Sequence, residues 1–234
     1  MNPKADIISS PPSNEVFSSL LKKYVNDTGF VDYKGFISER NIFEEYLNSL
    51  GSTPPDGSWS KNEQIAYWVN VYNAFTIKLI IDHYPLKSIK DIGPYIQIPR
   101  VNTPWQKKFI QIANKTYNLD KIEHSILRSK FNDPRIHFAL VCASISCPKL
   151  RSEAYEADKL DKQLNEQGRF FLANQNKNII EADKLKLSKY FTWYKADFTE
   201  DGSLIDYLNK FTPVKINGDA DIEYLEYNWG LNEQ

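Results

Sequence analysis

The segment between Ser60 and Pro85 restricts the fold of this chain more than any other feature of its sequence. Ser60 and Glu63 have the spacing of a capping box, in which a hydroxyl and a carboxylate bond to the free backbone amides at the start of a helix. Pro85 cannot continue helical hydrogen bonding, so the pattern predicts one long helix over about residues 61–84. Its most apolar stretch, 74–81, is interrupted by polar residues and is far shorter than the roughly 20 residues of a membrane span. We therefore expect a long helix but no membrane span.

Helical spacing of apolar residues dominates the rest of the chain, and strand-like patterns are few. We expect a predominantly helical α+β domain around a small, mainly antiparallel sheet. This single domain is expected over residues 14–234, after a mobile lead-in over residues 1–13. The other predicted helices cover about residues 13–25, 36–50, 120–130 and 155–174, with helical turns at 188–198 and 203–211. The predicted strands are a hairpin over 109–119, the apolar run 135–143 and the alternating segment 184–188, and the aromatic tail 222–231 is expected to pack against the domain.

The charge and the composition exclude several classes of protein. With 29 Lys and Arg against 30 Asp and Glu, the net charge is −1, which leaves no excess positive charge for binding nucleic acid. Nine glycines are few for a protein that binds nucleotides through a glycine-rich loop. Cys142 and Cys147 are the only two cysteines, too few for a disulfide-stapled scaffold or a four-thiolate zinc site. The expected partner is a small molecule or a peptide.

His137 is one of only three histidines and lies five residues before Cys142, in the apolar run predicted as a strand. A buried imidazole needs hydrogen-bond partners, because an unsatisfied buried polar group costs about 1–3 kcal/mol. Beside a cysteine, the imidazole could also act as a base that generates the reactive thiolate. Strand alternation places His137 and Cys142 on opposite faces, so either the chain bends after Val141 or His137 meets Cys147 across the following turn. A purely structural role for His137 is equally compatible with the sequence.

Glu123 and His124 are neighbours on the helix predicted over residues 120–130. Glu123 could close a capping box with Asp120, or it could be the carboxylate that orients an imidazole in a nucleophile–base–orienter set. His124 points about 100° away from Glu123 around the helix, toward Arg128 one turn later. The two side chains are therefore expected to contact different parts of the protein.

The cysteines have two alternative uses. His124, His137, Cys142 and Cys147 could form a metal site, but their spacing is not that of compact zinc modules, so we expect no metal and no other cofactor. A disulfide between the cysteines, in an exported protein, would remove both as nucleophiles. The first residues lack the apolar core of a signal peptide, as would a mature exported form.

Asn70 and Asn73 lie in the middle of the predicted long helix. Asparagine is a poor helix former and is costly to bury without a partner. We expect both side chains to bond to the backbone of a neighbouring loop, and a share in a polar site is the alternative.

Five segments resemble, in order, the family catalogued as domain of unknown function 547. They are YWVNVYNAF (67–75), LDKIEHSILR (119–128), RIHFALVCASISCPKLR (135–151), LSKYFTWYKADF (187–198) and YNWGLN (227–232). The resemblance spans about residues 15–234 and implies one complete domain of the bacterial single-domain type. Plant members of the family are similar around Glu123, His124, His137, Cys142, Ser144 and Arg151, but they carry serine at the position of Cys147. The resemblance therefore implies that Cys142 is the better nucleophile, and it argues against a disulfide as a general feature.

We predict a thiol-dependent acyl-transfer or hydrolytic enzyme. Cys142 would attack a carbonyl or amide carbon, His137 or His124 would transfer the proton, and Glu123 would orient the ring. Backbone amides of the turn over 143–147, aided by Asn73, would hold the oxyanion. The residues expected to contribute to binding are Asn70, Asn73, Arg128, Ser144, Cys147 and Arg151.

The alternative is a non-catalytic protein-interaction or ligand-binding module, because plant members join the domain to a coiled-coil-type region. A packed core with His137 bonded only to backbone would favour that module, whereas an open pocket holding a thiol and an imidazole would favour the enzyme. Because bacterial relatives are often exported, we expect a periplasmic or secreted protein, with a cytoplasmic location still open.

Overall fold

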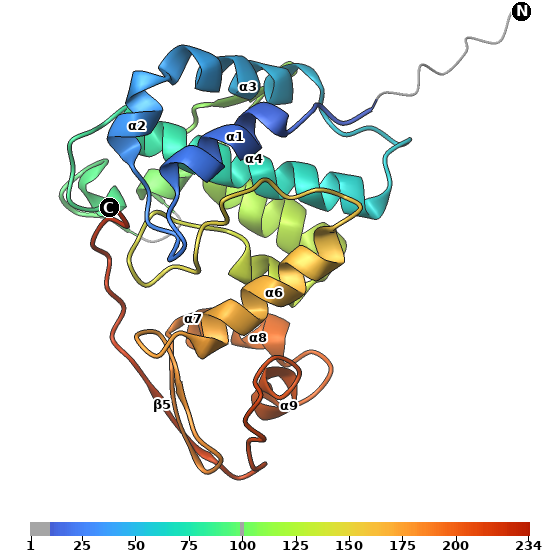
Figure 1. Cartoon of the computed structure of the whole chain (residues 1–234), viewed down its shortest axis with the longest axis vertical. Helices are drawn as coiled ribbons and strands as arrows, with labels where there is room; N and C mark the ends of the chain where they lie inside the picture. The colour runs from blue at the N-terminus through green and yellow to red at the C-terminus, as the bar shows by residue number, and fades with distance from the viewer. Residues whose placement is uncertain (1–9, 99–100) are drawn as a thin grey trace, which may run out of the picture.

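The computed structural model of the protein describes residues 10–98 and 101–234. Figure 1 shows the helix α4 lying between three N-terminal helices and the C-terminal part of the chain. The three N-terminal helices are α1 (Glu15–Tyr24), α2 (Tyr33–Ser38) and α3 (Arg40–Ser52), and the long helix beside them is α4 (Lys61–Ile81). The lead-in expected over residues 1–13 falls mostly on residues 1–9, which lie outside the described residues.

The long helix α4 forms where the sequence predicts it, and its capping box is present. The Ser60 hydroxyl accepts from the Glu63 amide at 3.3 Å, and the Glu63 carboxylate accepts from the Ser60 amide at 2.7 Å. Every residue from Ile65 to Ile77 is buried, because α2 and α3 contact the helix from one side and later segments cover the other. A helix that is buried all round in this way forms the centre of a core.

The middle of the chain consists of short elements. They are the 3-10 helices η1 (Ile89–Asp91) and η2 (Pro104–Gln106), the strands β1 (Ile110–Ile112) and β2 (Lys115–Tyr117), the π-helix η3 (Lys121–Arg128), α5 (Ser129–Phe131) and the 3-10 helix η4 (Pro134–Phe138). The predicted hairpin is confirmed, since β1 and β2 pair antiparallel with Gln111 opposite Thr116.

The predicted strand over residues 135–143 is wrong. Pro134 begins η4, and the buried chain that follows it is irregular. The Asn73 side chain donates to the Ala139 carbonyl oxygen and accepts from the Val141 amide, both at 2.9 Å, so these backbone groups need no neighbouring strand. A short apolar run indicates burial, but by itself it does not distinguish a strand from another buried conformation.

The C-terminal part carries one more helix of several turns and a second small sheet. Its elements are α6 (Leu160–Ala173), β3 (Ile179–Ile180), β4 (Lys184–Leu187), α7 (Tyr190–Trp193), α8 (Lys195–Phe198), α9 (Leu204–Leu208) and β5 (Asp221–Tyr224). Strand β4 pairs antiparallel with β3 and parallel with β5. The helical α+β class is as predicted, and the strands that the structure describes within residues 10–98 and 101–234 are divided between two small sheets.

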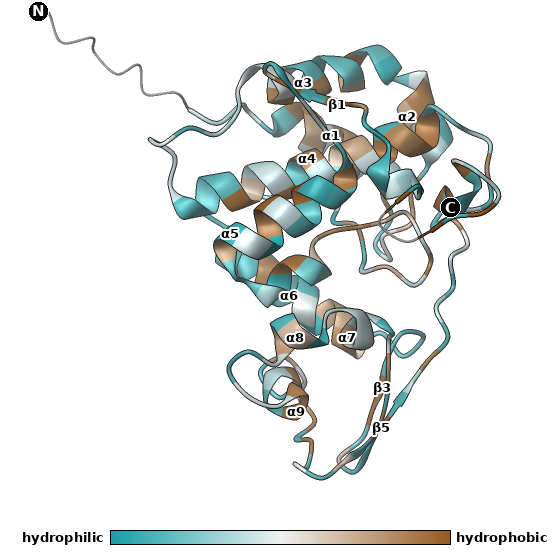
Figure 2. Ribbon diagram, turned by 180° about the vertical axis from the view of Figure 1, so that it is seen from behind, coloured by the Kyte–Doolittle hydropathy of each residue, from teal (hydrophilic) through white to brown (hydrophobic). Residues whose placement is uncertain are grey.

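The buried apolar residues of the described part of the chain form two cores. The larger core joins α1 to α4, the hairpin, η3 and residues 139–164, and the smaller joins Phe138, the end of α6, β4 and α7 to α9. Hydrophilic and hydrophobic residues alternate along α3 in Figure 2, as expected of a helix that buries one face. Within residues 10–98 and 101–234, no helix is long and apolar enough to cross a membrane. The segment from η4 to Cys147 passes from one core to the other, and it carries His137 and Cys142 of the candidate site.

Candidate functional site

A cavity of about 580 Å³ lies where the two cores meet. Tyr72 and Leu140 of the larger core and Tyr190 and Tyr227 of the smaller core all line it. Its other lining residues are Lys90, Tyr95, Gln97, Thr103, Trp105, Gln106, Asp120, Glu123, His124, His137, Cys142, Trp193, Tyr194 and Trp229. Because Tyr95 and Trp193 are exposed, the cavity opens to solvent.

Aromatic rings form much of the cavity wall. The Trp193 ring stacks on that of Trp229 with their centroids 5.8 Å apart, and Tyr227 contacts both. Trp105 packs edge-on against Trp229. Such rings offer large apolar surfaces to a ligand with a flat or apolar part. The aromatic tail therefore packs down, as predicted, and contributes Tyr227 and Trp229 to the cavity.

His137 lies on the cavity wall and is only 1% exposed. Its Nε2 lies 2.7 Å from a carboxylate oxygen of Asp197, and its ring stacks on Tyr194 with centroids 3.8 Å apart. Burial lowers the pKa of His137, although the bond to Asp197 acts in the opposite direction. The ring is therefore neutral at neutral pH and donates from Nε2, which leaves the electron pair of Nδ1 free to accept a proton. Within the described part of the chain, no donor bonds to Nδ1.

Asp197 is held in place by Arg128. The guanidinium donates to both carboxylate oxygens, at 2.7 and 2.6 Å. Partial burial alone would raise the pKa of Asp197, but hydrogen bonds from His137 and Arg128 hold it well below its ordinary value. Asp197 thus stays ionised and fixes the orientation of the imidazole. Asp197 was not among the residues predicted from the sequence, although it is the only carboxylate of the segment over 187–198 that carries part of the family resemblance.

His124 joins the same network through Arg128. The second terminal nitrogen of the guanidinium donates to His124 Nδ1 at 2.8 Å, as the predicted direction of His124 toward Arg128 requires. His124 Nε2 therefore carries the proton, and it lies 3.6 Å from Asp120 at the cavity wall. One arginine connects two imidazoles that both line the cavity. Both His124 and Arg128 lie on the π-helix η3, a type of distortion that is common at functional sites.

Glu123 has neither of its predicted partners. It closes no capping box, since Asp120 makes no side-chain bond at the start of η3. It orients no imidazole either, because its carboxylate accepts from Tyr194 at 2.6 Å and from Tyr72 at 3.3 Å. Burial raises the pKa of both tyrosines well above the ordinary value, and Glu123 adds to the shift, so both hydroxyls stay protonated and donate. The carboxylate that orients His137 is Asp197.

Cys142 and Cys147 form a disulfide with their Cα atoms 6.2 Å apart. The resemblance to plant members argued against this bond. Cys142 lines the cavity, while Cys147 is only 1% exposed. Ser144 lies behind the wall and bonds to Tyr227 at 2.8 Å. In this oxidised form neither sulfur is a free thiol, so Cys142 cannot act as a nucleophile until the disulfide is reduced. Within the described residues, no group of three or more His, Cys, Asp or Glu side chains is arranged to hold a metal ion.

Asn70 and Asn73 both bond to loop backbone, as predicted. The Asn70 side chain donates to the Tyr155 carbonyl at 2.8 Å and accepts from the Tyr155 amide at 2.9 Å. The bonds of Asn73 to residues 139 and 141 occupy the amide group that we expected to hold an oxyanion. The turn amides of 145–147 are likewise bonded to carbonyl oxygens.

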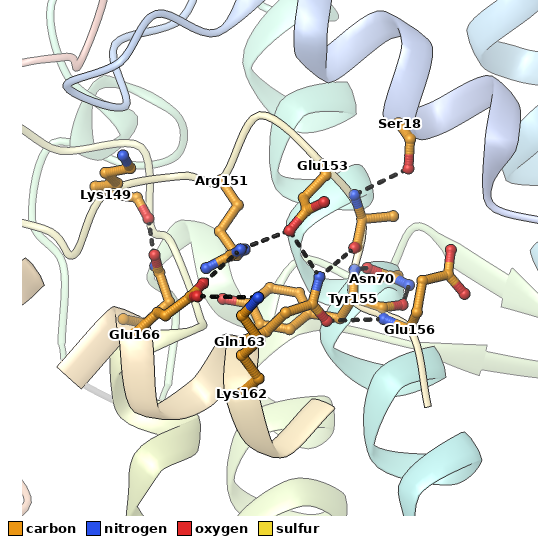
Figure 3. Close-up of polar contacts among 12 residues, drawn as sticks. Ser18, Asn70, Lys149, Arg151, Glu153, Tyr155, Glu156, Lys162, Gln163 and Glu166 are labelled. Atoms are coloured by element: carbon orange, nitrogen blue, oxygen red, sulfur yellow. Dashed lines mark hydrogen bonds and ion pairs between the residues drawn. The ribbon is translucent and has the colours of Figure 1, made fainter. Parts of the chain in front are cut away.

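Arg151 lies in a separate polar cluster (Figure 3). It donates to Glu153 at 2.5 Å and to Glu166 at 3.0 Å. Gln163 extends the cluster by donating to Glu153 at 3.1 Å. This network ties the loop before α6 to the helix, and Arg151 is not part of the cavity lining.

The fold and the site define a mainly helical α+β domain with a histidine–aspartate–arginine network at an aromatic cavity. Residues 57–172 match the sequence model of the family described as "Protein of unknown function, DUF547". The chain therefore contains a domain of this family, as the resemblance implied. No curated protein and no solved structure matches the chain. His124, Arg128 and His137 lie within the matched range, whereas Asp197 lies after it.

Proposed function

We propose that the protein is a hydrolase that acts on the acyl group of a small molecule bound in the aromatic cavity, with His137 as the general base. The single observation that carries this proposal is the bond between His137, which lines the cavity, and Asp197, which lies outside the cavity lining. A neutral imidazole with a fixed tautomer is the group that removes a proton from water or from a hydroxyl nucleophile.

In the proposed reaction, Nδ1 of His137 takes a proton from a water molecule in the cavity while the water oxygen attacks the acyl carbon. The ring then carries a positive charge, which the ionised Asp197 stabilises through the bond at 2.7 Å. The bond between the acyl carbon and the leaving group then breaks as His137 returns the proton to the leaving group, so the enzyme gains or loses no net proton. Arg128 acts as a positioning residue, because it fixes both oxygens of Asp197.

His124 is assigned a second role at the same cavity. Because Nδ1 accepts from Arg128, the proton of the neutral ring is on Nε2. An N–H group at the wall can donate to a substrate oxygen that gains negative charge during the reaction. The aromatic rings would hold the acyl or leaving group by stacking.

Thiol-dependent acyl transfer is the second candidate function, and the position of Cys142 on the cavity wall favours it. Reduction of the disulfide would free Cys142 to attack the acyl carbon, with a histidine of the same cavity as the base. The disulfide is typical of an oxidising compartment, which supports a periplasmic or secreted location.

Hydrolysis of p-nitrophenyl acetate tests these functions against each other. We expect His137→Gln to lower kcat/KM by about 10²-fold or more, as removal of a general base does. The matched control is His83→Gln, because His83 lies at the end of α4 outside the cavity lining. Loss of hydrolysis in a C142S/C147S variant would instead support the thiol mechanism. A ligand-binding module would show saturable quenching of the cavity tryptophans without turnover in any variant.

A further inference from the structure

The disulfide at the cavity wall has two sulfur atoms in different surroundings. Cys142 is 7% exposed and lines the cavity, whereas Cys147 is 1% exposed and lies behind it. A molecule that enters the cavity therefore meets Cys142 first. We propose that this disulfide is a thiol–disulfide exchange site, at which a small thiol attacks Cys142 and displaces Cys147. The inference does not depend on the hydrolytic role of His137.

Hydrogen-bond donors surround the sulfur of Cys147. The backbone amide of Cys142 donates to it at 3.0 Å, and the hydroxyls of Ser144 and Tyr227 each lie at 3.3 Å. The Tyr190 hydroxyl lies at 3.6 Å. Donors of this kind stabilise a thiolate more than a neutral sulfur, and a thiol that ionises more readily is the better leaving group.

The sulfur of Cys142 has fewer potential donors. It contacts the hydroxyls of Ser144 at 3.3 Å and Tyr227 at 3.4 Å, which it shares with Cys147. The amide and the Tyr190 hydroxyl contact Cys147 alone. Lys177 also donates to the carbonyl oxygen of Cys147 and adds a positive charge beside that residue. Exposure and hydrogen bonding therefore assign the same direction to the exchange, with attack at Cys142 and departure of Cys147.

The exchange is balanced with a thiol as the only co-reactant. The attacking thiolate forms a sulfur–sulfur bond with Cys142, and the electron pair of the broken bond stays on Cys147. A second thiolate then attacks the sulfur of the first thiol and displaces Cys142. Two thiols are oxidised to one disulfide, and the protein disulfide is reduced to two thiols, which take up the two protons.

Single-cysteine variants test the direction of the exchange. Cys147→Ser leaves Cys142 as a free thiol at the cavity, and it should form a mixed disulfide with glutathione disulfide within minutes, as measured by mass spectrometry of the intact native protein. Cys142→Ser leaves Cys147 behind the wall, and it should react at least roughly 10-fold more slowly until the protein is denatured. Equal rates, or faster reaction of the second variant, would overturn the proposal.

The leaving-group argument is tested in the protein with both cysteines. Reduction by glutathione should be slowed roughly 3- to 10-fold by Tyr190→Phe, because a hydrogen bond to the departing thiolate is lost. Tyr67→Phe is the matched control, since this buried tyrosine lies outside the cavity lining and donates to the Leu50 carbonyl oxygen and not to sulfur. Equal reduction rates in the two variants, or reduction of the protein only after unfolding, would contradict the assignment. The C142S/C147S variant cannot exchange disulfides, but its hydrolysis of p-nitrophenyl acetate can still be measured. Failure of this inference is therefore distinguishable from failure of the proposed function.

Discussion

Two arginine-centred clusters contain the same kinds of side chain but differ in what surrounds them. Arg128 pairs with Asp197 and donates to His124, and this cluster borders the cavity. Arg151 pairs with Glu153 and Glu166, and Figure 3 shows this cluster between a loop and α6. Both arginines were candidates for a binding role from the sequence, and only Arg128 belongs to a network at the cavity.

The difference lies in where each network ends. In the Arg151 cluster, Gln163 bonds to Glu153 and also donates to the Ala154 carbonyl oxygen at 2.9 Å, so the network ends on the backbone of the protein. In the Arg128 cluster, the network ends on two imidazoles at the cavity wall. A polar network that ends on backbone holds a loop in place, whereas one that ends at a cavity retains hydrogen-bonding capacity for a ligand.

The largest expected effect is the loss of hydrolysis when the negative charge of Asp197 in the Arg128 cluster is removed. Asp197→Asn should lower kcat/KM for p-nitrophenyl acetate by about 10²–10⁴-fold, because the imidazole loses the carboxylate that fixes its tautomer and stabilises its charged form. Glu153→Gln, the matched change in the Arg151 cluster, should leave the rate within about two-fold of the wild type. Similar losses in both variants would remove the distinction between the clusters.

Replacing Arg151 is expected to lower the stability of the protein without lowering its activity. Arg151→Met should lower the free energy of unfolding by about 1–3 kcal/mol, because the loop before α6 loses its ion pairs and two partly exposed carboxylates lose their partner. Hydrolysis of the probe by the folded variant should be unchanged. Urea unfolding and initial rates measure the two quantities, and a large rate loss at full folding would connect this cluster to the site.

A smaller effect is expected in the pH dependence of stability. Burial lowers the pKa of His137 from its ordinary 6.5, so the unfolded chain takes up this proton at a higher pH than the folded protein. His137 therefore contributes stability above about pH 6.5 that is lost as the pH falls toward its folded pKa. Urea unfolding between pH 8 and 5 should show a steeper decline in the free energy of unfolding for the wild type than for His137→Gln. A steeper decline in the variant would contradict the neutral ring.

Local features of the fold could be predicted from the sequence. The capping box at Ser60 and the end of the pattern at Pro85 predicted the long helix, because both signals act within a few residues. The positions of His124 and Arg128 followed from their spacing on one helix. The conformation of residues 135–143 could not be predicted in the same way, because the side chain of Asn73 on α4 satisfies two of its backbone groups.

The partner of His137 could not be predicted because it is distant in the chain. Asp197 follows His137 by 60 residues and belongs to the short helix α8, whose position depends on the packing of the smaller core. Glu123 was closer in sequence and carried the same chemical group, but its carboxylate is bound by Tyr72 and Tyr194. Burial and residue type indicated that His137 needed a partner, and only the tertiary structure identifies it.

The protonation state of His137 is the most direct test of the central claim, that a neutral imidazole is fixed with its free nitrogen available at the cavity. Nitrogen-15 chemical shifts resolve the tautomer, and the three histidines can be assigned with His83→Gln and His124→Gln variants. We expect a neutral ring at pH 7 with the proton on Nε2, and a pKa below 6.5. A charged ring at pH 7, or a proton on Nδ1 of the neutral form, would contradict the account.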